Sequence, residues 1–185
     1  RIKDVSTIPV IFFPGGVGQL NSHYDAMLFM SIISGRNPHY LIGEQAIAAP
    51  MVKDLGVETI PTGYMLMDGG TGSTVEFMSG TKPIPMNRSD IAVAHALAAE
   101  FMGKKLIYLE AGSGATEAIS KDIIQSVASE TNVPLIVGGG IKTPEAAHES
   151  VEAGASFIVT GTVLEKNGDN GLMNAFADAV HGGTS

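Results

Sequence analysis

The sequence contains no cysteine and no tryptophan, and only 6% of its 185 residues are aromatic. The absence of cysteine excludes disulfide bonds, cysteine-ligated zinc sites and a thiol nucleophile. It also fits a reducing compartment, and we therefore expect the protein in the cytoplasm. No uninterrupted apolar stretch approaches the ~18 residues that indicate a membrane span, so no transmembrane segment is expected.

Positive charge is also scarce. Eleven Lys and Arg residues face 19 Asp and Glu residues, which gives a formal net charge of −8. An acidic surface repels the phosphate backbone, so we do not expect a nucleic acid as a partner. The 44% apolar and 16% charged residues exclude an intrinsically disordered chain. The length predicts a single domain over residues 1–185.

Short apolar segments recur along the chain and are apolar at nearly every position. Strands that are buried on both faces show this pattern, which favours a parallel sheet covered by helices. The predicted strands are residues 8–13, 26–32, 58–67, 106–109, 134–137 and 156–160.

Helical segments are predicted between these strands, at residues 42–55, 88–103, 117–131, 144–153 and 172–181. Alternation of strands and helices indicates βα units and an α/β fold. Residues 68–85 break the alternation, because they are rich in glycine, carry two prolines and surround a strand-like stretch at residues 74–78. We expect a hairpin-like flap there.

Three glycine-rich turns directly follow predicted strands, at residues 110–114, 138–141 and 161–162. Glycine lets the backbone approach an anion closely and direct N–H groups at it. In (β/α)8 barrels the loops after strands seven and eight commonly form one phosphate-binding cup. Gly139–Gly140 and Gly161–Thr162 have the spacing of such a cup. The alternative is that these turns are purely structural.

If the last two strands are strands seven and eight, two βα units precede Arg1. The sequence begins with Arg1 rather than Met, and 185 residues fall short of the ~250 of a typical barrel. We therefore predict a (β/α)8 TIM-type barrel whose first two βα units are absent from the printed sequence.

Glu110 ends the strand that leads into the first glycine-rich turn, at the edge where barrel enzymes carry out their chemistry. A carboxylate beside an anion-binding loop is more consistent with a base or a hydroxyl-binding group than with a structural ion pair. Tyr108 projects from the same face of that strand, so it belongs either to the site or to the core. Ser113 either binds phosphate or caps the next helix.

Other polar or flexible side chains are weaker candidates. The five histidines show no metal-ligand spacing. Glu44 and Gln45 either border the site or simply begin a helix. Met65, Met67 and Met78 lie close to the flap in the sequence and are candidates for the wall of an apolar groove.

Five sequence blocks occur in a characteristic order, at residues 12–15, 26–31, 61–64, 108–115 and 137–141. The most specific is Tyr-Leu-Glu-Ala-Gly-Ser-Gly-Ala, and the last is Val-Gly-Gly-Gly-Ile. With these blocks the chain resembles the geranylgeranylglyceryl phosphate synthases of archaea and their bacterial heptaprenylglyceryl phosphate synthase relatives.

The resemblance implies a prenyltransferase of archaeal ether phospholipid biosynthesis. Such an enzyme moves the polyprenyl group of geranylgeranyl diphosphate to the hydroxyl of sn-glycerol 1-phosphate, uses Mg²⁺ and forms homo-oligomers. The implied catalytic residues are Glu110 and Tyr108. The implied magnesium ligands, an Asp ending strand one and a Ser or Thr after strand two, are expected before Arg1. The residues implied to hold sn-glycerol 1-phosphate are Tyr108, Leu109, Glu110, Ala111, Gly112, Ser113, Gly114, Gly139, Gly140, Gly161 and Thr162.

Two other functions fit the same predicted barrel. A phosphosugar isomerase or lyase needs an acid and a base that face each other across the substrate, whereas this sequence offers one convincing carboxylate. A non-catalytic barrel that binds a phosphorylated metabolite needs neither. Only the prenyltransferase requires an elongated apolar groove beside Glu110, and the depth of that groove would set the length of the prenyl donor.

Overall fold

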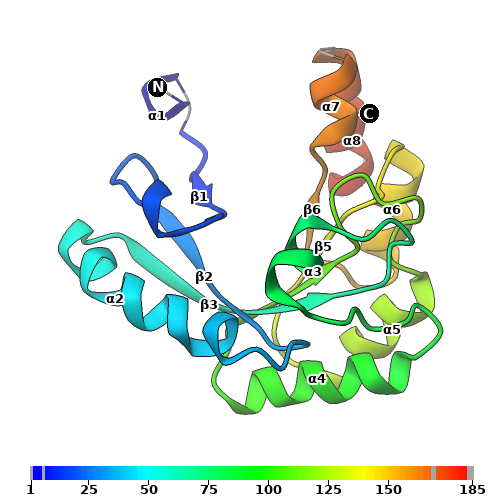
Figure 1. The fold of residues 1–185 in the computed structure, drawn as a ribbon. Coiled ribbons are helices and arrows are strands. Elements are labelled where there is room, and N and C mark those ends of the chain that lie inside the picture. The colour runs from blue at the N-terminus through cyan, green and yellow to red at the C-terminus, as the bar shows by residue number, and fades with distance from the viewer. Residues whose placement is uncertain (1, 6, 168–169, 183–185) are drawn as a thin grey trace.

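The computed structural model describes residues 2–5, 7–167 and 170–182, and it shows a curled sheet of six parallel strands (Figure 1). The order of the strands in the sheet follows the chain, as in the wall of a β/α barrel. The strands are β1 (Ile11–Phe12), β2 (Ala26–Ile32), β3 (Glu58–Leu66), β4 (Leu106–Glu110), β5 (Leu135–Gly138) and β6 (Phe157–Val159).

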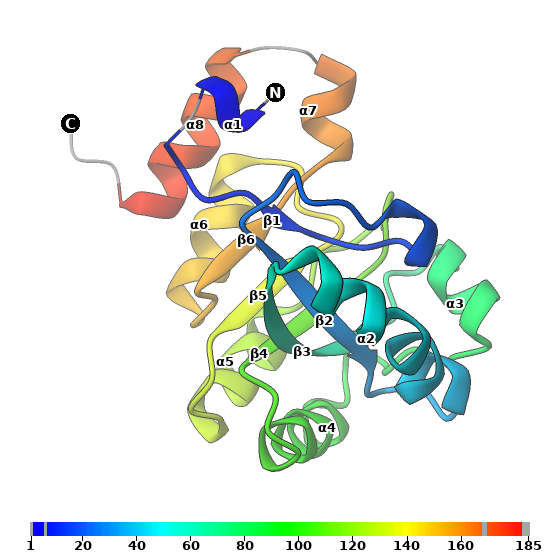
Figure 2. The same ribbon diagram turned by 90° about the vertical axis from the view of Figure 1, so that its left-hand side faces the viewer.

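Helices connect most of the strands and cover the outside of the curled sheet (Figure 2). The principal connections α2, α4, α5 and α6 follow β2, β3, β4 and β5. The helical elements are α1 (Ile2–Val5), the 3-10 turn η1 (Val17–Gln19), the π-helical turn η2 (His39–Gly43), α2 (Glu44–Leu55), α3 (Thr74–Ser79), α4 (Ser89–Phe101), α5 (Lys121–Glu130), α6 (Pro144–Glu152), α7 (Thr162–Asn167) and α8 (Asn170–His181). Among the described residues, none of the helices is long and apolar enough to cross a membrane.

The two faces of the sheet pack against different surroundings because successive side chains of a strand point to opposite sides. On the outer face, residues such as Leu109 and Val137 belong to the core formed with the helices. On the inner face, Leu28, Tyr64 and Tyr108 belong to a second buried cluster. The strands are therefore apolar at nearly every position, as the sequence predicts.

Helix α4 packs unusually close to the sheet. Its residues Ala92, Ala96 and Ala99 are fully buried. A Cβ atom on Gly63 of β3 would lie only 2.7 Å from the Cβ atom of Ala99. Because small residues meet at this point, α4 lies close to β3 there, and Met65, Ile107 and Leu109 pack in the same core.

The flap is where the sequence prediction is wrong. The stretch from residue 74 to 78 is not strand-like but lies in α3. Ser73 accepts a hydrogen bond from the Glu76 amide, and the Glu76 carboxylate accepts one from the Ser73 amide, which is a capping box. Gly80 ends the helix in the left-handed conformation, with φ of +61°. These caps outweigh the β preference of the side chains between them.

Candidate active site

The glycine-rich turns after β4, β5 and β6 surround one cavity of about 560 Å³, here called the cup. The sequence analysis placed a phosphate site at these turns, and the structure brings them together. The cup is lined by Glu110, Ser113, Gly114, Ala115, Gly139, Gly140, Ile141, Lys142, Val159, Thr160, Gly161, Thr162, Val163 and Glu165. Ser113 is exposed in the cup wall and does not cap α5, because Ser120 accepts the capping hydrogen bond from Ile123.

The backbone conformation of the turn after β5 requires glycine at two positions. Gly139 and Gly140 have φ of +82° and +72°, a conformation that other residues adopt only with strain. A Cβ atom on Gly139 would lie 2.7 Å from both Glu110 Oε1 and the Gly112 nitrogen. A Cβ atom on Gly140 would overlap the carbonyl of Glu117. The turns after β4 and β5 therefore interlock, backbone against backbone.

Glu110 stands where these two turns meet. Its Oε1 atom accepts a hydrogen bond of 2.7 Å from the Gly112 amide. Burial raises the pKa of the Glu110 carboxyl, while hydrogen bonds from Gly112 and from the Tyr108 hydroxyl oppose the rise. The direction of the net shift indicates a carboxylate that is more basic than an ordinary glutamate.

Tyr108 belongs to the buried cluster on the inner face of the sheet, and its hydroxyl also reaches the carboxylate that lines the cup. The side chain is 2% exposed, and its hydroxyl reaches the Glu110 carboxylate. A Cβ atom on Gly138 would lie 2.7 Å from that hydroxyl, so glycine leaves the space for it. Burial and the negative charge of Glu110 raise the pKa of Tyr108, which keeps the hydroxyl protonated as a hydrogen-bond donor.

Two of the predicted binding residues place their side chains in the core and do not line the cup. The Leu109 side chain is fully buried on the outer face of the sheet. The Ala111 side chain also belongs to that core, and the Ala111 amide donates a hydrogen bond of 3.0 Å to the Gly138 carbonyl. These residues fix the position of the Glu110–Gly114 loop instead of lining the cup.

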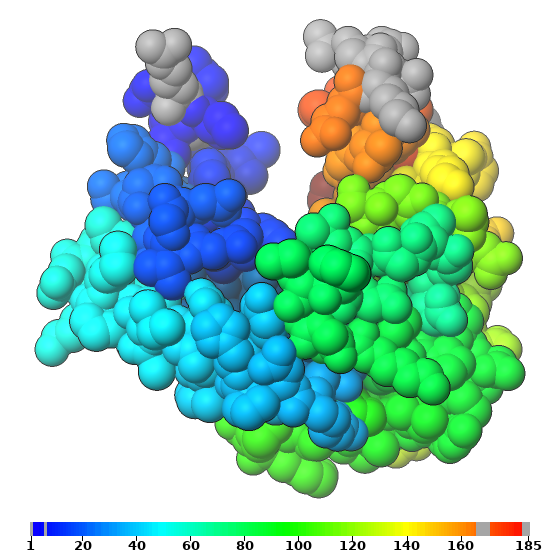
Figure 3. All heavy atoms as spheres, viewed as in Figure 1, coloured from blue at the N-terminus to red at the C-terminus, as the bar shows by residue number. Residues whose placement is uncertain are grey.

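A second cavity, of about 440 Å³ and here called the groove, lies along β2, where it is lined by residues from both faces of that strand, and is mostly apolar. The space-filling view shows the molecule hollowed between its N-terminal segment, in blue, and its C-terminal segment, in orange (Figure 3). The groove is lined by Phe13, Pro14, Gly15, Gly16, Val17, Leu20, Met27, Leu28, Phe29, Met30, Ile32, Tyr40, Glu44, Gln45, Ala48, Tyr64, Thr74, Val75 and Met78.

An aromatic cluster joins the groove to the cup. Phe13 and Tyr64 line the groove, and their rings contact the ring of Tyr108 with centroids 5.6 Å and 5.2 Å away. The Tyr108 hydroxyl in turn lies beside Glu110, which lines the cup. The apolar groove is thus connected to the predicted catalytic carboxylate through the ring of Tyr108.

The predictions for the groove are partly confirmed. Glu44 and Gln45 border it, and so does Met78 of α3. Met65 and Met67 do not, because both are buried on the outer face of the sheet, behind the inward-facing Tyr64 and Leu66. The error follows from the alternation of side chains along a strand.

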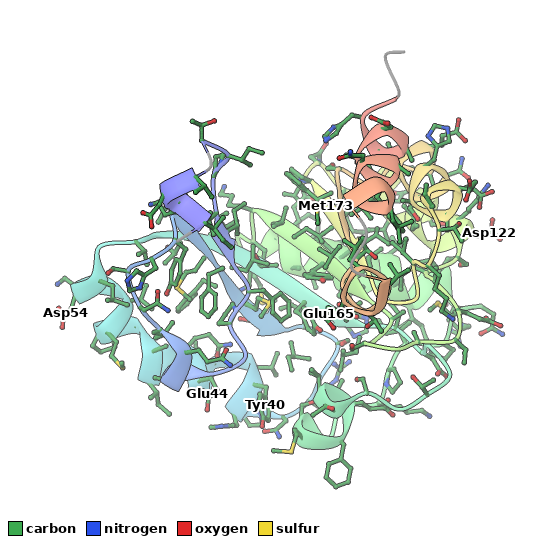
Figure 4. The ribbon with its side chains drawn as sticks, turned by 90° about the horizontal axis from the view of Figure 1, so that it is seen from above. Tyr40, Glu44, Asp54, Asp122, Glu165 and Met173 are labelled. Carbon is green, nitrogen blue, oxygen red and sulfur yellow. The ribbon has the colours of Figure 1, made fainter. Side chains whose placement is uncertain are left out.

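Several site residues were missed by the sequence analysis. Lys142 lines the cup, and its place two residues after Gly140 was the available signal. Glu165 belongs to α7, a helix too short to stand out in the sequence. Seen from above, Tyr40 and Glu44 lie on the α2 side of the opening and Glu165 on α7, whereas Asp54 and Asp122 lie at the periphery (Figure 4). Phe13 and Tyr64 lie in the blocks 12–15 and 61–64 that carry the resemblance, but their chemistry did not mark them as residues of a groove.

The part of the chain that the structure describes contains no set of magnesium ligands. Within it, no group of three or more His, Asp or Glu side chains could hold a metal ion. Glu110 is engaged by Gly112 and Tyr108, and Glu165 is the other carboxylate that lines the cup. We therefore assign none of these residues to the ion.

Comparison with known proteins gives a consistent result. A model of the PcrB family matches residues 1–180. A protein named geranylgeranylglyceryl phosphate synthase from Methanosphaera stadtmanae is 48% identical over 181 residues, which cover 97% of this chain and 74% of the relative. Another of that name, from Chitinophaga pinensis, is 46% identical over 181 residues, which cover 98% of this chain and 71% of the relative.

Solved structures show the same likeness in three dimensions. The (S)-3-O-geranylgeranylglyceryl phosphate synthase of Thermoplasma acidophilum, in complex with its substrate sn-glycerol-1-phosphate, superimposes with a TM-score of 0.88 at 36% identity. The match covers 97% of this chain and 71% of that one. The Thermoplasma volcanium enzyme gives a TM-score of 0.85 at 37% identity over 98% of this chain and 71% of that one.

Proposed function

The chain belongs to the PcrB family, and on that premise we propose that the protein transfers a polyprenyl group from its diphosphate to the free hydroxyl of sn-glycerol 1-phosphate. One observation carries the proposal beyond the family name. A glycine-built cup and an apolar groove are connected by one pair of side chains, the buried Tyr108 and the half-buried Glu110. The acceptor and the donor of this reaction need those two environments side by side.

The cup suits the acceptor. Its backbone turns at Gly139–Gly140 and Gly161–Thr162 have the form that lets N–H groups surround a phosphate, and Lys142 adds a positive charge to the wall. The substrate seen in the Thermoplasma acidophilum relative is sn-glycerol-1-phosphate. With the phosphate in the cup, the glycerol hydroxyls extend toward Glu110.

Glu110 then accepts the proton of the attacking hydroxyl of sn-glycerol 1-phosphate. As the C–O bond to the diphosphate breaks, the allylic carbon gains positive charge and the bonding pair leaves with the diphosphate. The glycerol oxygen forms the new C–O bond, and its proton passes to the Glu110 carboxylate. The Gly112 amide and the protonated Tyr108 hydroxyl fix the orientation of that carboxylate before the reaction begins.

The groove suits the donor. Burial of each CH₂ group contributes about 0.8 kcal/mol, so a long prenyl chain binds an apolar wall tightly without polar contacts. Val75 and Met78 of α3 form part of this wall. The flap, residues 68–85, thus covers the bound prenyl chain and is called the lid from this point on. A phosphosugar isomerase or lyase, or a barrel that only binds a phosphorylated metabolite, has no use for such a wall, and the groove therefore favours the prenyltransferase. Geranylgeranyl diphosphate is the donor that we propose.

Three further features are part of the proposal. A requirement for Mg²⁺ and a homo-oligomeric state rest on the resemblance, and a cytoplasmic location rests on the absence of cysteine. Mg²⁺ would neutralise charge on the departing diphosphate, which is chemistry that no described side chain duplicates at this site.

The activity can be tested directly. We expect radiolabel from sn-glycerol 1-phosphate to move into the organic phase when the protein is incubated with geranylgeranyl diphosphate and Mg²⁺. The enantiomer sn-glycerol 3-phosphate is the matched control and should be transferred far more slowly, since Glu110 fixes which oxygen can attack. Failure to label a lipid with farnesyl, geranylgeranyl and heptaprenyl diphosphate alike would remove the proposed function.

The pH dependence of turnover follows from the shifted pKa of Glu110. The group must be ionised to accept a proton, and burial raises its pKa above the ordinary glutamate value. Turnover should therefore begin to fall, as the pH is lowered, at a higher pH than an ordinary glutamate would give. A pH–rate profile from about pH 4 to pH 8 measures the acid limb. An acid limb at or below the ordinary glutamate value would argue against Glu110 as the base.

A further inference from the structure

The lid, residues 68–85, contacts the loop that carries Glu110 as well as lining the groove. Thr74, Val75 and Met78 of α3 line the groove. The start of the lid, by contrast, packs against the loop that carries Glu110. The main-chain amide of Met67, just before the lid, donates a hydrogen bond of 2.8 Å to the Glu110 carbonyl.

Thr116 holds the first turn of the lid. Its backbone amide and its Oγ1 atom both donate to the carbonyl oxygen of Gly69, at 3.1 Å and 3.0 Å. Gly69 has no room for a side chain, because a Cβ atom would overlap the Ala111 carbonyl. A Cβ atom on Gly70 would lie 2.8 Å from Thr116 Oγ1. The start of the lid therefore fits closely against the Ala111 carbonyl at Gly69 and against Thr116 at Gly70.

Thr116 is also bonded to the opposite wall of the cup. The Nζ atom of Lys142 donates a hydrogen bond of 3.1 Å to the Thr116 carbonyl. Lys142 follows the interlocked turn of Gly139 and Gly140 and lines the cup. One residue thus connects the lid, the β4 loop and the β5 loop.

The lid reaches the catalytic loop at a second point. Ser73, the N-cap of α3, lies so close that a Cβ atom on Gly112 would be 3.0 Å from the Ser73 Cβ atom. The Gly112 amide is the group that binds Glu110 Oε1. A lid that shifts at Gly69 therefore shifts against the loop that orients Glu110.

We propose that Thr116 is a positioning residue for prenyl transfer, which holds the lid over the prenyl chain in register with Glu110. The inference rests on the proposed function for the identity of the ligand in the groove. Thr116 is exposed and lines neither cavity, so it acts through Gly69 and not on a substrate. Its loss should affect the prenyl donor and leave the glycerol phosphate site intact.

The test compares Thr116→Val with Thr116→Ser. Valine has the shape of threonine and keeps the backbone hydrogen bond but loses the Oγ1 donor, whereas serine keeps the donor. We expect Thr116→Val to raise KM for geranylgeranyl diphosphate by about 3- to 10-fold, the scale of one hydrogen bond. The affinity for sn-glycerol 1-phosphate should stay within about 2-fold, and Thr116→Ser should restore KM.

Thr131→Val is the matched control, because Thr131 Oγ1 also donates to a main-chain carbonyl, that of Val127, at 2.8 Å and away from the site. Amide hydrogen exchange of residues 74–79 is the second readout. Exchange should be faster in Thr116→Val than in Thr116→Ser and Thr131→Val, with or without geranylgeranyl diphosphate.

The two proposals fail in different ways. If the wild-type protein transfers no prenyl group, the proposed function is refuted. The amide hydrogen exchange rates of residues 74–79 without ligand then still decide whether Thr116 holds the lid. An active enzyme in which Thr116→Val matches Thr131→Val in both KM and exchange overturns the inference. Loss of glycerol phosphate affinity in Thr116→Val would overturn it as well, since the residue would then serve the cup.

Discussion

Gly139→Val is expected to weaken the binding of sn-glycerol 1-phosphate by about 100-fold or more. Hydrogen bonds to a charged group contribute about 1.5–3 kcal/mol each, and the loss of two is enough for this effect. The valine Cβ atom would lie 2.7 Å from Glu110 Oε1 and from the Gly112 nitrogen, so the β4 and β5 turns must separate. The remaining valine atoms need still more space, and the amides of the turn can no longer point at one phosphate.

The strain of a left-handed valine must be separated from this effect. Gly103→Val provides the control, because Gly103 has φ of +84° at the end of α4 and no atom within 4 Å of its Cβ position. Both variants carry the same kind of backbone strain, but only one disturbs the cup. Calorimetric titration with sn-glycerol 1-phosphate measures the difference, and equal affinities in the two folded variants would refute the cup.

Much of this architecture is readable from the sequence because one physical rule governs each part. A strand covered on both sides must be apolar throughout, and residues 26–32 were predicted as a strand with the bounds of β2. The turn after β5 needs positive φ values, which only glycine tolerates freely, so the residues Gly139 and Gly140 indicate the site in the sequence.

The groove could not be predicted in the same way. Its walls come from the loop after β1, the strands β2 and β3, and the helices α2 and α3, and no local pattern connects these segments. An inward phenylalanine such as Phe13 resembles any core residue in the sequence. The lid was misread for a related reason, since the capping pair Ser73 and Glu76 decided its conformation against the preference of Val75 and Phe77.

Glu110→Gln is expected to lower kcat by about 100-fold or more, the usual scale for losing a general base. Glutamine keeps the length of the side chain and an oxygen that can accept the hydrogen bond from Gly112, but it cannot take up the proton of the attacking hydroxyl. The affinity for sn-glycerol 1-phosphate should change little, in contrast to Gly139→Val, because the phosphate is held by the turns.

The same substitution should make the protein more stable at neutral pH. Burial raises the pKa of Glu110 in the folded state, so the folded protein binds this proton more tightly than the unfolded chain does. The stabilisation from the protonated group is complete below the unfolded pKa and is lost as the pH rises through the folded pKa. Above the folded pKa the wild type has lost it, whereas a neutral glutamine has no charge to bury.

The two effects of Glu110→Gln together identify the role of the carboxylate. A residue that only supports the fold would lose stability and activity in parallel when changed, whereas a buried base loses turnover and gains stability. Thermal unfolding at pH 7 and at a pH below 4.5 should show the gain at the higher pH alone. Glu130→Gln, an exposed substitution at the end of α5, should change neither quantity. A Glu110→Gln variant with nearly normal turnover would exclude Glu110 as the proton acceptor and leave positioning of the two substrates as this chain's contribution to the reaction.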